Sequence, residues 1–320
     1  MPLEWLFTLA GASPMGRDWL VRLGWRGRAG AAVVYWFAND HRRPTGVAKV
    51  PAGIAGDDMG AEDVALRTLG PAARAAGARV PEVVRSASRE SAGALLLTAV
   101  EGHPAARLLA RRPQQLPALL DSLVAWLSAW NFATYVAADD TGGGHLLEAV
   151  AVARKVENRA PEAAGYASWL DGLCAEVASQ VPTVAAHNDL TMWNVLVGSG
   201  NEISVLDWEA ARPDGLPLAD LFYTLVDAVA AATKSARLDA LRACFTAPGR
   251  VLHVARALAS RFGYVERLPP EVIDVCFHAC WLLHADDALR RRAGQTDEEF
   301  IQIAEWLARE RPRVSALLLT

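Results

Sequence analysis

One stretch decides the fold of this chain: His187-Asn-Asp-Leu-Thr-Met-Trp-Asn194, followed after a hydrophobic run by Asp207-Trp208-Glu209. Asp189 lies five residues before Asn194, and Asp207 lies thirteen residues after it. Carboxylate and amide oxygens are the hard ligands that Mg²⁺ prefers, and a carboxylate also accepts a proton. The stretch therefore combines groups that hold a metal ion with a group that handles a proton.

The order and spacing of these residues predict phosphoryl transfer from a nucleotide. Asp189 would accept a hydrogen bond from a substrate hydroxyl and take its proton, while Asn194 and Asp207 would bind Mg²⁺. His187 is expected to brace the loop by hydrogen bonds, because Asp189 already fills the role of base; the alternative is a catalytic histidine. Nothing in the stretch identifies the phosphate acceptor.

A nucleotide also requires protein cations near its phosphates, and Lys49 is the candidate. It lies in Val47-Ala-Lys-Val50, an apolar strand in which a single lysine is unfavourable unless its ammonium meets a carboxylate or a phosphate. Glu62, on the helix expected next, can pair with it. The alternatives are an edge-strand lysine that points to water and an ordinary exposed glutamate.

Composition indicates one large or two modest globular domains. Hydrophobic residues make up 52% of the 320 residues, which fills a sizeable core and excludes a disordered protein. The formal charge of −4 is too small to indicate nucleic acid or an anionic membrane surface as the main partner. The four cysteines are few and unevenly spaced, which is typical of reduced core thiols rather than of a disulfide framework.

The sequence predicts no transmembrane segment and a cytoplasmic location. The longest apolar run near the middle, 92–100, has about half of the roughly 20 residues that a membrane-spanning helix requires. Residues 1–16 are apolar, but they contain Glu4 and no basic residue before their short hydrophobic centre, which disfavours a signal peptide.

Up to about residue 100 the pattern predicts a small sheet and one helix. The helix carries Val64, Leu66 and Leu69 after an Asp57-Asp58 start, which suits a helix N-terminus. Short apolar runs bounded by Gly, Pro, Asn and Asp predict strands over 19–24, 31–37, 46–50 and 94–100.

After Glu101-Gly-His-Pro104 the pattern becomes mainly helical, and the domain boundary is placed here. An amphipathic helix is expected over 116–130 and one or two helices over 151–180. Asp139-Asp-Thr-Gly-Gly-Gly144, between them, is expected to form a surface turn.

A hairpin is expected to carry Asn194 and Asp207, with strands over 195–197 and 203–206. Helical spacing returns at Leu218, and three or four further helices are expected up to the C-terminus. The predicted fold class is thus α+β.

The string His187-Asn-Asp-Leu-x-x-x-Asn194-Val-Leu with Leu206-Asp-Trp-Glu209 resembles the aminoglycoside phosphotransferase and choline kinase superfamily. The resemblance implies a protein-kinase-like fold with two lobes. A small antiparallel sheet with one helix would occupy 1–100, with a hinge at about 98–102, and a larger helical lobe would occupy 103–320. The likeness spans roughly 19–225 and includes Glu62-Asp-Val-Ala-Leu66-Arg-Thr-Leu69, Val80-Pro-Glu-Val83, 95–102 and Pro217-Leu-Ala-Asp220-Leu.

By this resemblance, ATP is the phosphate donor, and GTP is the alternative donor. Lys49 binds the α and β phosphates, Glu62 orients Lys49, and Thr98 and Val100 belong to the hinge that holds adenine. One departure from the family is the phosphate loop, which reads Gly24-Trp-Arg-Gly27-Arg-Ala-Gly30 instead of a recognisable Gly-x-Gly-x-x-Gly. Its amides would cover phosphates with help from its arginines, or it is a plain hairpin turn.

The resemblance also implies the roles in the catalytic loop. Asp189 is the catalytic base or positioner, Asn194 and Asp207 hold Mg²⁺, and Asp220 supports the loop from below. The usual His-Gly-Asp is His-Asn-Asp here, as in choline kinases.

Two further groups each carry two interpretations. Trp193 and Trp208 would close the site against water or pack the hairpin into the helical lobe. Cys276, Cys280 and His284 recur every four residues, which suits a metal site, but no fourth ligand is evident and their aromatic neighbours indicate a core helix.

Carboxylates in the C-terminal part would favour a cationic acceptor, although Arg290-Arg-Arg292 opposes them and they also suit solvated helix faces. The candidates are Asp214, Asp227, Glu271, Asp274, Asp286 and Asp287.

The function expected first is an ATP-dependent, Mg²⁺-requiring O-phosphotransferase that acts on a hydroxyl of a small molecule. A sugar, an aminoglycoside or a related metabolite is favoured, because the motif looks most like proteins encoded with bacterial glycan and natural-product pathways. The alternative is a catalytically silent kinase-like module that binds a nucleotide or a partner. A protein kinase is disfavoured, because no activation segment lies between Asp207 and Asp220. The oligomeric state stays open.

Overall fold

The computed structural model describes residues 19–22, 31–37, 43–51, 59–89, 92–138, 140–246, 250–290 and 298–318. The chain divides into two compact units: Met1–His103 with Leu196–Ala211, and Pro104–Val195 with Arg212–Thr320. A five-stranded sheet lies in the first unit and most helices lie in the second, so the predicted α+β class is confirmed.

The sheet of the first unit is antiparallel throughout, in the order β1-β2-β3-β5-β4. Alternate residues of its inner strands, such as Ala48 and Val50, gather into one apolar cluster. Lys49 therefore points to the opposite face, beside its register partner Leu95. The strands are β1 (Trp19–Arg22), β2 (Ala31–Trp36), β3 (Gly46–Pro51), β4 (Val83–Arg89) and β5 (Ala92–Thr98).

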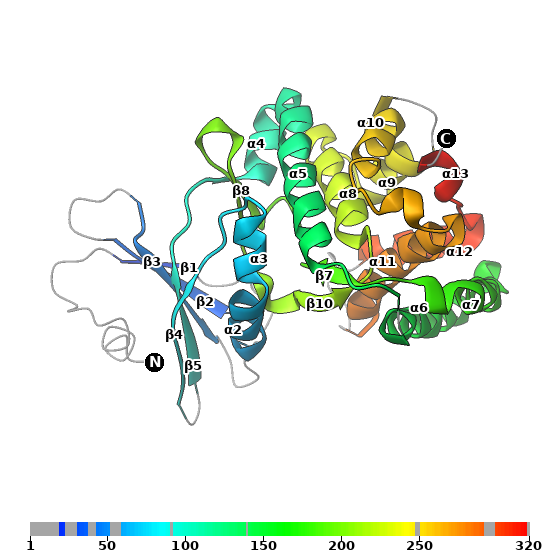
Figure 1. Cartoon of the computed structure of the whole chain (residues 1–320), viewed down its shortest axis with the longest axis horizontal. Coiled ribbons are helices and arrows are strands. Elements are labelled where there is room, and N and C mark those ends of the chain that lie inside the picture. The colour runs from blue at the N-terminus through cyan, green and yellow to red at the C-terminus, as the bar shows by residue number, and fades with distance from the viewer. Residues whose placement is uncertain are drawn as a thin grey trace. The chain divides into compact units, whose positions relative to one another are not determined.

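Two helices lie beside this sheet, α2 (Met59–Thr68) and α3 (Gly70–Ala75), as Figure 1 shows. The sequence predicted one helix here. The structure breaks it at Leu69, because Pro71 has no N–H to donate and its ring would clash with the carbonyl one turn earlier. The predicted Asp57-Asp58 start lies outside the described residues.

The predicted hairpin is confirmed as β8 (Val195–Val197) and β9 (Ile203–Val205), joined by the 3-10 turn η4 (Ser199–Asn201). It forms a three-stranded sheet with β6 (His103–Pro104) in the order β6-β8-β9. The backbone of Arg79 forms two hydrogen bonds with β9, one on each side of Ser204 along the chain. The Arg79 N–H donates to the Ile203 carbonyl (2.9 Å), and the Arg79 carbonyl accepts from the Val205 N–H (2.9 Å). These bonds join β9 to the segment that follows α3 within the first unit.

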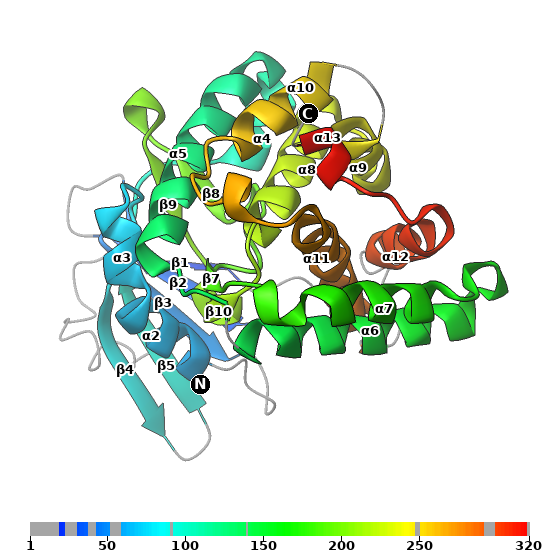
Figure 2. The same ribbon diagram turned by 45° about the vertical axis from the view of Figure 1, so that its right-hand side comes forward.

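The second unit is built mainly of helices. Figure 2 shows α6 and α7 side by side, and both also pack against α11. The α-helices are α4 (Ala105–Arg111), α5 (Leu116–Thr134), α6 (Asp140–Arg159), α7 (Tyr166–Val177), α8 (Ala219–Thr233), α9 (Arg237–Phe245), α10 (Arg250–Ala259), α11 (Pro270–Arg290), α12 (Glu298–Glu310) and α13 (Ser315–Leu318). Short 3-10 turns are η1 (Pro113–Gln115), η2 (Pro161–Ala163), η3 (Ala178–Gln180) and η6 (Val265–Arg267), and β7 (Val184–Ala186) pairs with β10 (Arg212–Gly215).

The surface turn predicted over 139–144 is wrong, because α6 begins at Asp140 and includes the glycine run. Each helical glycine costs about 1 kcal/mol relative to alanine. Burial of Leu146 and Val150, in a helix that packs on α7 and α11, outweighs that cost. No helix among the described residues is both long and apolar enough to cross a bilayer.

Candidate active site

Lys49 in the middle of β3 forms the centre of a charged cluster in the first unit. Its ammonium lies 2.7 Å from Glu62 Oε2 on α2 and 2.5 Å from Asp207 Oδ1 beyond β9. Only 15% of the Lys49 side chain and 1% of the Glu62 side chain are exposed, whereas Asp207 is 36% exposed. The interpretation of Lys49 as an edge-strand lysine that points to water is therefore wrong.

Burial and attraction act in opposite directions on this cluster. Burial lowers the pKa of the Lys49 ammonium, but Asp207 and Glu62 outweigh it and hold the pKa above its usual range. Burial raises the pKa of Glu62, and Lys49 beside it offsets part of that rise. Lys49 is thus a permanent cation held in one place by two carboxylates.

Asp207 occupies an unusual backbone conformation with φ at +65°. This left-handed region costs roughly 1–2 kcal/mol for most residues, and Asp is among those that visit it. The 3-10 turn η5 (Trp208–Ala210) follows, and the Trp208 N–H donates to Glu62 Oε1 at 3.3 Å. Glu62 therefore orients Lys49 with one oxygen and fixes the backbone after Asp207 with the other.

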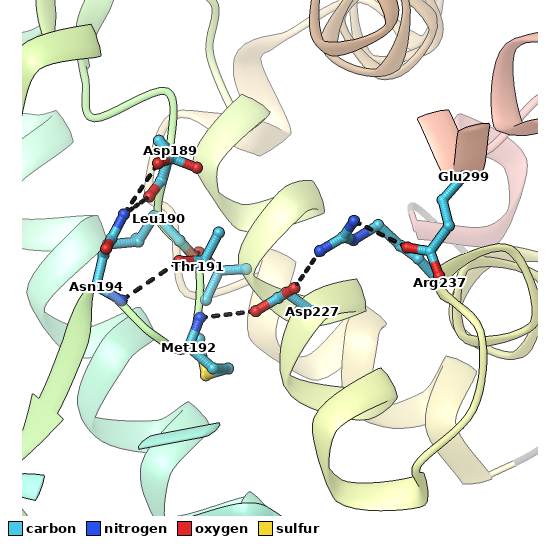
Figure 3. A network of polar contacts seen from close by, with 9 residues as sticks. Asp189, Leu190, Thr191, Met192, Asn194, Asp227, Arg237 and Glu299 are labelled. Atoms are coloured by element: carbon cyan, nitrogen blue, oxygen red, sulfur yellow. Dashed lines mark hydrogen bonds and ion pairs between the residues drawn. The ribbon is translucent and has the colours of Figure 1, made fainter. Parts of the chain in front are cut away.

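Asp189 and Asn194 meet within one loop of the second unit (Figure 3). The Asn194 side-chain amide donates to the Asp189 carbonyl (2.8 Å) and to Asp189 Oδ2 (3.0 Å). Because its nitrogen is committed to two acceptors, the amide oxygen of Asn194 is the atom suited to a cation. The Thr191 N–H donates to the Asp189 carbonyl, and the Asn194 N–H to the Thr191 carbonyl, so the loop is closed on itself.

One face of α8 holds this loop from beneath. Asp220 accepts from the N–H groups of His187 (2.7 Å) and Asn188 (2.9 Å). Thr224 donates its hydroxyl to the Leu190 carbonyl at 3.1 Å. Farther along α8, Asp227 accepts from the Met192 N–H at 2.7 Å. The three helical residues follow the i, i+4, i+7 spacing of one helix face.

Asp220 is buried, and its ionisation reflects that environment. Burial raises the pKa of its carboxyl to about 6, although the N–H bonds from His187 and Asn188 oppose the rise. His187 is itself buried, and its Nδ1 accepts a long hydrogen bond of 3.4 Å from the Asp189 N–H. These contacts are those of a residue that braces the loop.

The two residues predicted for the hinge, Thr98 and Val100, lie at and just after the end of β5. Thr98 pairs with Gly46, and its N–H donates to the Glu82 carbonyl at 2.9 Å. Its hydroxyl accepts from the Glu82 N–H at 2.8 Å. Val100 follows two residues later and is half-buried.

A family model described as the phosphotransferase enzyme family (APH) matches residues 31–258. The chain belongs to this family. It is therefore a small-molecule phosphotransferase, and the resemblance read from the sequence is confirmed. A search of curated proteins found no match to the chain.

Solved structures of aminoglycoside phosphotransferases share the fold. APH(3'')-Id from Streptomyces rimosus is 19% identical with a TM-score of 0.56, and the match covers 87% of this chain and 97% of that one. A thermostable mutant of APH(4)-Ia, in a ternary complex with ADP and hygromycin B, is 14% identical with a TM-score of 0.59, covering 99% and 98%. ADP-bound APH(2'')-Ib is 12% identical with a TM-score of 0.57, covering 96% and 97%. The predicted kinase-like fold class is thereby confirmed.

Several carboxylates that the sequence offered as sites for a cationic acceptor have partners inside this phosphotransferase. Asp227 is committed to the loop. Asp214 takes two bonds from Arg212 (2.8 and 3.2 Å), and Asp286 pairs with Lys155. Asp274 accepts from the Ser315 N–H and hydroxyl and from Arg313.

The loop-holding roles of Thr224 and Asp227 in the phosphotransferase were missed by sequence reasoning. The sequence offers Asp227 as a contact for a cationic acceptor or as part of a solvated helix face. The signal that identifies both residues is their spacing from Asp220, four and seven residues along the same helix.

The two tryptophans of the phosphotransferase differ in their surroundings. Trp208 is fully buried and donates its indole N–H to the Val205 carbonyl at 3.0 Å, so it packs the hairpin. Trp193 is 56% exposed, and the Arg107 guanidinium lies 5.7 Å from its ring centre. Trp208 therefore packs within the first unit, where η5 lies against α2, and not into the helical lobe. Trp193 is too exposed for a packing residue.

The four cysteines of the phosphotransferase are buried thiols, as the sequence predicted. His284 stacks on Tyr223 with ring centres 4.1 Å apart, and the described residues contain no group of three or more His, Cys, Asp or Glu arranged to hold a metal. The zinc interpretation of Cys276, Cys280 and His284 is therefore wrong. The phosphate-loop prediction over Gly24–Gly30 lies outside the described residues.

Proposed function

We propose that this phosphotransferase moves the γ-phosphoryl group of ATP, in the presence of Mg²⁺, to a hydroxyl of a small molecule. The observation that carries the proposal is Lys49, a buried cation fixed by Glu62 and Asp207 in the middle of a sheet. Such a lysine has the charge and rigidity needed to bind nucleotide phosphates. That some neighbouring structures contain ADP agrees with a nucleotide donor.

The donor set suits Mg²⁺. Asp207 offers a carboxylate and Asn194 an amide oxygen, both hard ligands, and Mg²⁺ commonly binds through one or two protein groups together with phosphates and water. When bound, the ion would neutralise charge on the phosphates. Thr98 and Val100 would lie at the hinge, where backbone groups hold adenine.

In the proposed reaction Asp189 accepts the hydrogen bond of the acceptor hydroxyl, aligns the oxygen and takes its proton. The Asn194 amide, which donates to Asp189 Oδ2, keeps the carboxylate in a fixed orientation. His187 and Asp220 act through the loop backbone rather than on the substrate.

We further propose an acceptor with little positive charge, such as a neutral sugar, in preference to a polyamine. An acceptor with several amino groups needs unpaired carboxylates around it. Four of the six candidates, Asp214, Asp227, Asp274 and Asp286, already have internal partners. Hygromycin B, which is bound in one neighbouring structure, is a ligand of that enzyme and does not identify the acceptor of this one.

A screen of acceptors tests the proposal. Wild type is incubated with ATP or GTP and with neutral sugars, aminoglycosides or amino alcohols, and nucleoside diphosphate formation is measured with Mg²⁺ and with excess chelator. We expect Mg²⁺-dependent transfer that Asp189→Asn abolishes and that Asp239→Asn, a change of an exposed carboxylate on α9, leaves intact.

Undiminished transfer by Asp189→Asn would contradict the assigned role. Tight ATP binding without turnover on any acceptor would favour a silent binding module. Preference for aminoglycosides over neutral sugars would contradict the proposed acceptor class.

A further inference from the structure

We propose that Arg237 is a positioning residue for phosphoryl transfer, which acts by holding Asp227 against the backbone of the catalytic loop at Met192. The inference rests on the proposed function for its catalytic consequence. Its structural part, the coupling of Arg237 to the loop, stands independently of any acceptor.

Asp227 bridges the loop and Arg237 through its two oxygens (Figure 3). Oδ2 accepts from the Met192 N–H and Oδ1 accepts from Arg237 Nη2, each at 2.7 Å. The Asp227 side chain is buried, so the carboxylate has little water to replace either partner. Removing Arg237 would leave a charged group with one amide as its partner, a strongly unfavourable arrangement.

Arg237 is itself held from several sides. Its Nη1 lies 3.2 Å from Glu299 Oε2 on α12, and its guanidinium lies 4.8 Å from the ring centre of Phe300 and 5.8 Å from that of Tyr223. A planar guanidinium that pairs with carboxylates and covers aromatic rings has a defined orientation, which a lysine does not reproduce. α9 and α12 therefore set the position of Asp227.

Met192 lies between the two groups that would do the chemistry. Asp189 comes three residues before it and Asn194 two residues after it, and the hydrogen bonds of Asn194 to Asp189 and Thr191 close the loop around it. A shift of the Met192 amide must be taken up within this closed loop. Small displacements of this kind alter rate more than they alter substrate binding.

The same unit offers a matched control. Asp274 on α11 also accepts a backbone N–H, that of Ser315 at 2.8 Å, and also pairs with an arginine, Arg313 at 3.3 Å. That pair joins α11 to the chain before α13, and no described contact joins it to the loop 187–194. Arg313→Gln therefore removes a comparable ion pair without touching the loop.

The experiment compares Arg237→Gln, Arg237→Lys, Asp227→Asn and Arg313→Gln with wild type. Hydrogen–deuterium exchange is measured on peptides that span 187–195, together with kcat, KM for the acceptor and the Mg²⁺ concentration that gives half-maximal activity. For Arg237→Gln and Asp227→Asn we expect faster exchange at 187–195 and a fall in kcat of about tenfold to a hundredfold. KM for the acceptor should be unchanged, the Mg²⁺ requirement should rise, and Arg237→Lys should restore part of kcat.

Three outcomes would overturn the inference: wild-type exchange at 187–195 in both Arg237→Gln and Asp227→Asn, full activity of both, or an equal loss of kcat in Arg313→Gln. If Arg237→Gln fails to fold, Arg237→Lys and Asp227→Asn carry the same test, because each preserves most of the side-chain volume. Failure of the proposed function has a different signature: wild type forms no nucleoside diphosphate with any acceptor, whereas the exchange of the loop still reports on Arg237.

Discussion

Asp227 lies two helical turns after Asp220 on α8, and the two carboxylates accept hydrogen bonds from different parts of the same loop. Asp220 binds the N–H groups of residues 187 and 188, and Asp227 binds that of residue 192. A loop fixed at both positions holds its side chains in place without any regular structure of its own. In the proposed reaction, the helix would supply the rigidity that positioning of a phosphate acceptor requires.

Asp220→Asn is expected to slow phosphoryl transfer and to change its pH dependence. An amide has one acceptor oxygen, so one of the two N–H groups loses its partner at a cost of about 1–3 kcal/mol. In wild type the pKa of Asp220 is about 6, because burial raises it, and the loop loses an ionised acceptor as pH falls through that value. The part of the acid decline of kcat centred near 6 should therefore be absent in Asp220→Asn. A pH–rate profile that keeps this part unchanged would contradict the assignment.

Much of the site was readable from residue types in context. Lys49 was identifiable because a lysine within an apolar strand requires an anionic partner, and the structure supplies Glu62 and Asp207. The sequence alone does not reveal that Asp227 accepts a loop N–H, because this depends on which helix face lies under the loop. Sequence spacing reveals that face only after Asp220 has been placed beneath it.

The fold likewise has elements that local sequence predicts and elements that depend on tertiary packing. The short apolar run 46–50 predicted a strand, and the structure has it as β3, with Ala48 and Val50 in the apolar cluster and Lys49 on the opposite face. The glycine run 142–144 predicted a turn by propensity, but packing of α6 on α7 and α11 keeps it helical. Local preference decides where no large buried surface opposes it.

Substitutions in the charged cluster of the first unit should affect stability and catalysis differently. Lys49→Met leaves the buried Glu62 without a cation, and breaking such a pair costs about 3–5 kcal/mol. Glu62→Gln in the same chain removes the uncompensated charge. We expect Lys49→Met/Glu62→Gln to unfold at a higher temperature than Lys49→Met, while both variants lose phosphoryl transfer. Equal unfolding temperatures would indicate that Glu62 does not depend on Lys49 for its charge balance.

His278 is expected to make the protein less stable in acid. Burial lowers its pKa from 6.5 to about 4, and its two ring nitrogens face the Tyr166 hydroxyl (2.8 Å) and the Pro312 carbonyl (2.9 Å). The folded pKa is the lower one, so the unfolded chain binds more protons between about 4 and 6.5. The free energy of unfolding therefore falls as pH drops through this window, by up to about 1.4 kcal/mol per pH unit for one site.

Asp220 has the opposite effect on the free energy of unfolding between pH about 4 and 6, because its pKa is higher in the folded protein than in the unfolded chain. The pH dependence of wild type alone therefore does not reveal the contribution of His278. Urea unfolding of wild type and His278→Gln at a series of pH values reveals it, since the contribution of Asp220 is common to both proteins. We expect the difference in unfolding free energy to shrink as pH falls from 6.5 towards 4. A difference that is independent of pH would rule out titration of His278 as a source of acid lability.

Gly102 lies at the end of the proposed hinge. Substitution of Gly102 by alanine tests whether a glycine is needed there for its backbone conformation or because a side chain would clash with its neighbours. The φ of Gly102 is +139°, and a Cβ there would lie 2.7 Å from Leu196 Cβ and 3.0 Å from the Val197 nitrogen. Gly77 is the matched control, because its φ is +111° and a Cβ would meet nothing within 4 Å. Alanine at either position carries the backbone cost of about 1–3 kcal/mol, and overpacking adds about 1–3 kcal/mol at Gly102 alone.

Gly102→Ala should therefore unfold at a lower denaturant concentration than Gly77→Ala, with the same dependence on denaturant. If the contact with β8 also fixes the hinge, Gly102→Ala should raise KM for ATP, whereas Gly77→Ala should not. Equal loss of stability in the two variants would mean that Leu196 and Val197 move aside without cost. In that case the glycine is required by the backbone conformation alone.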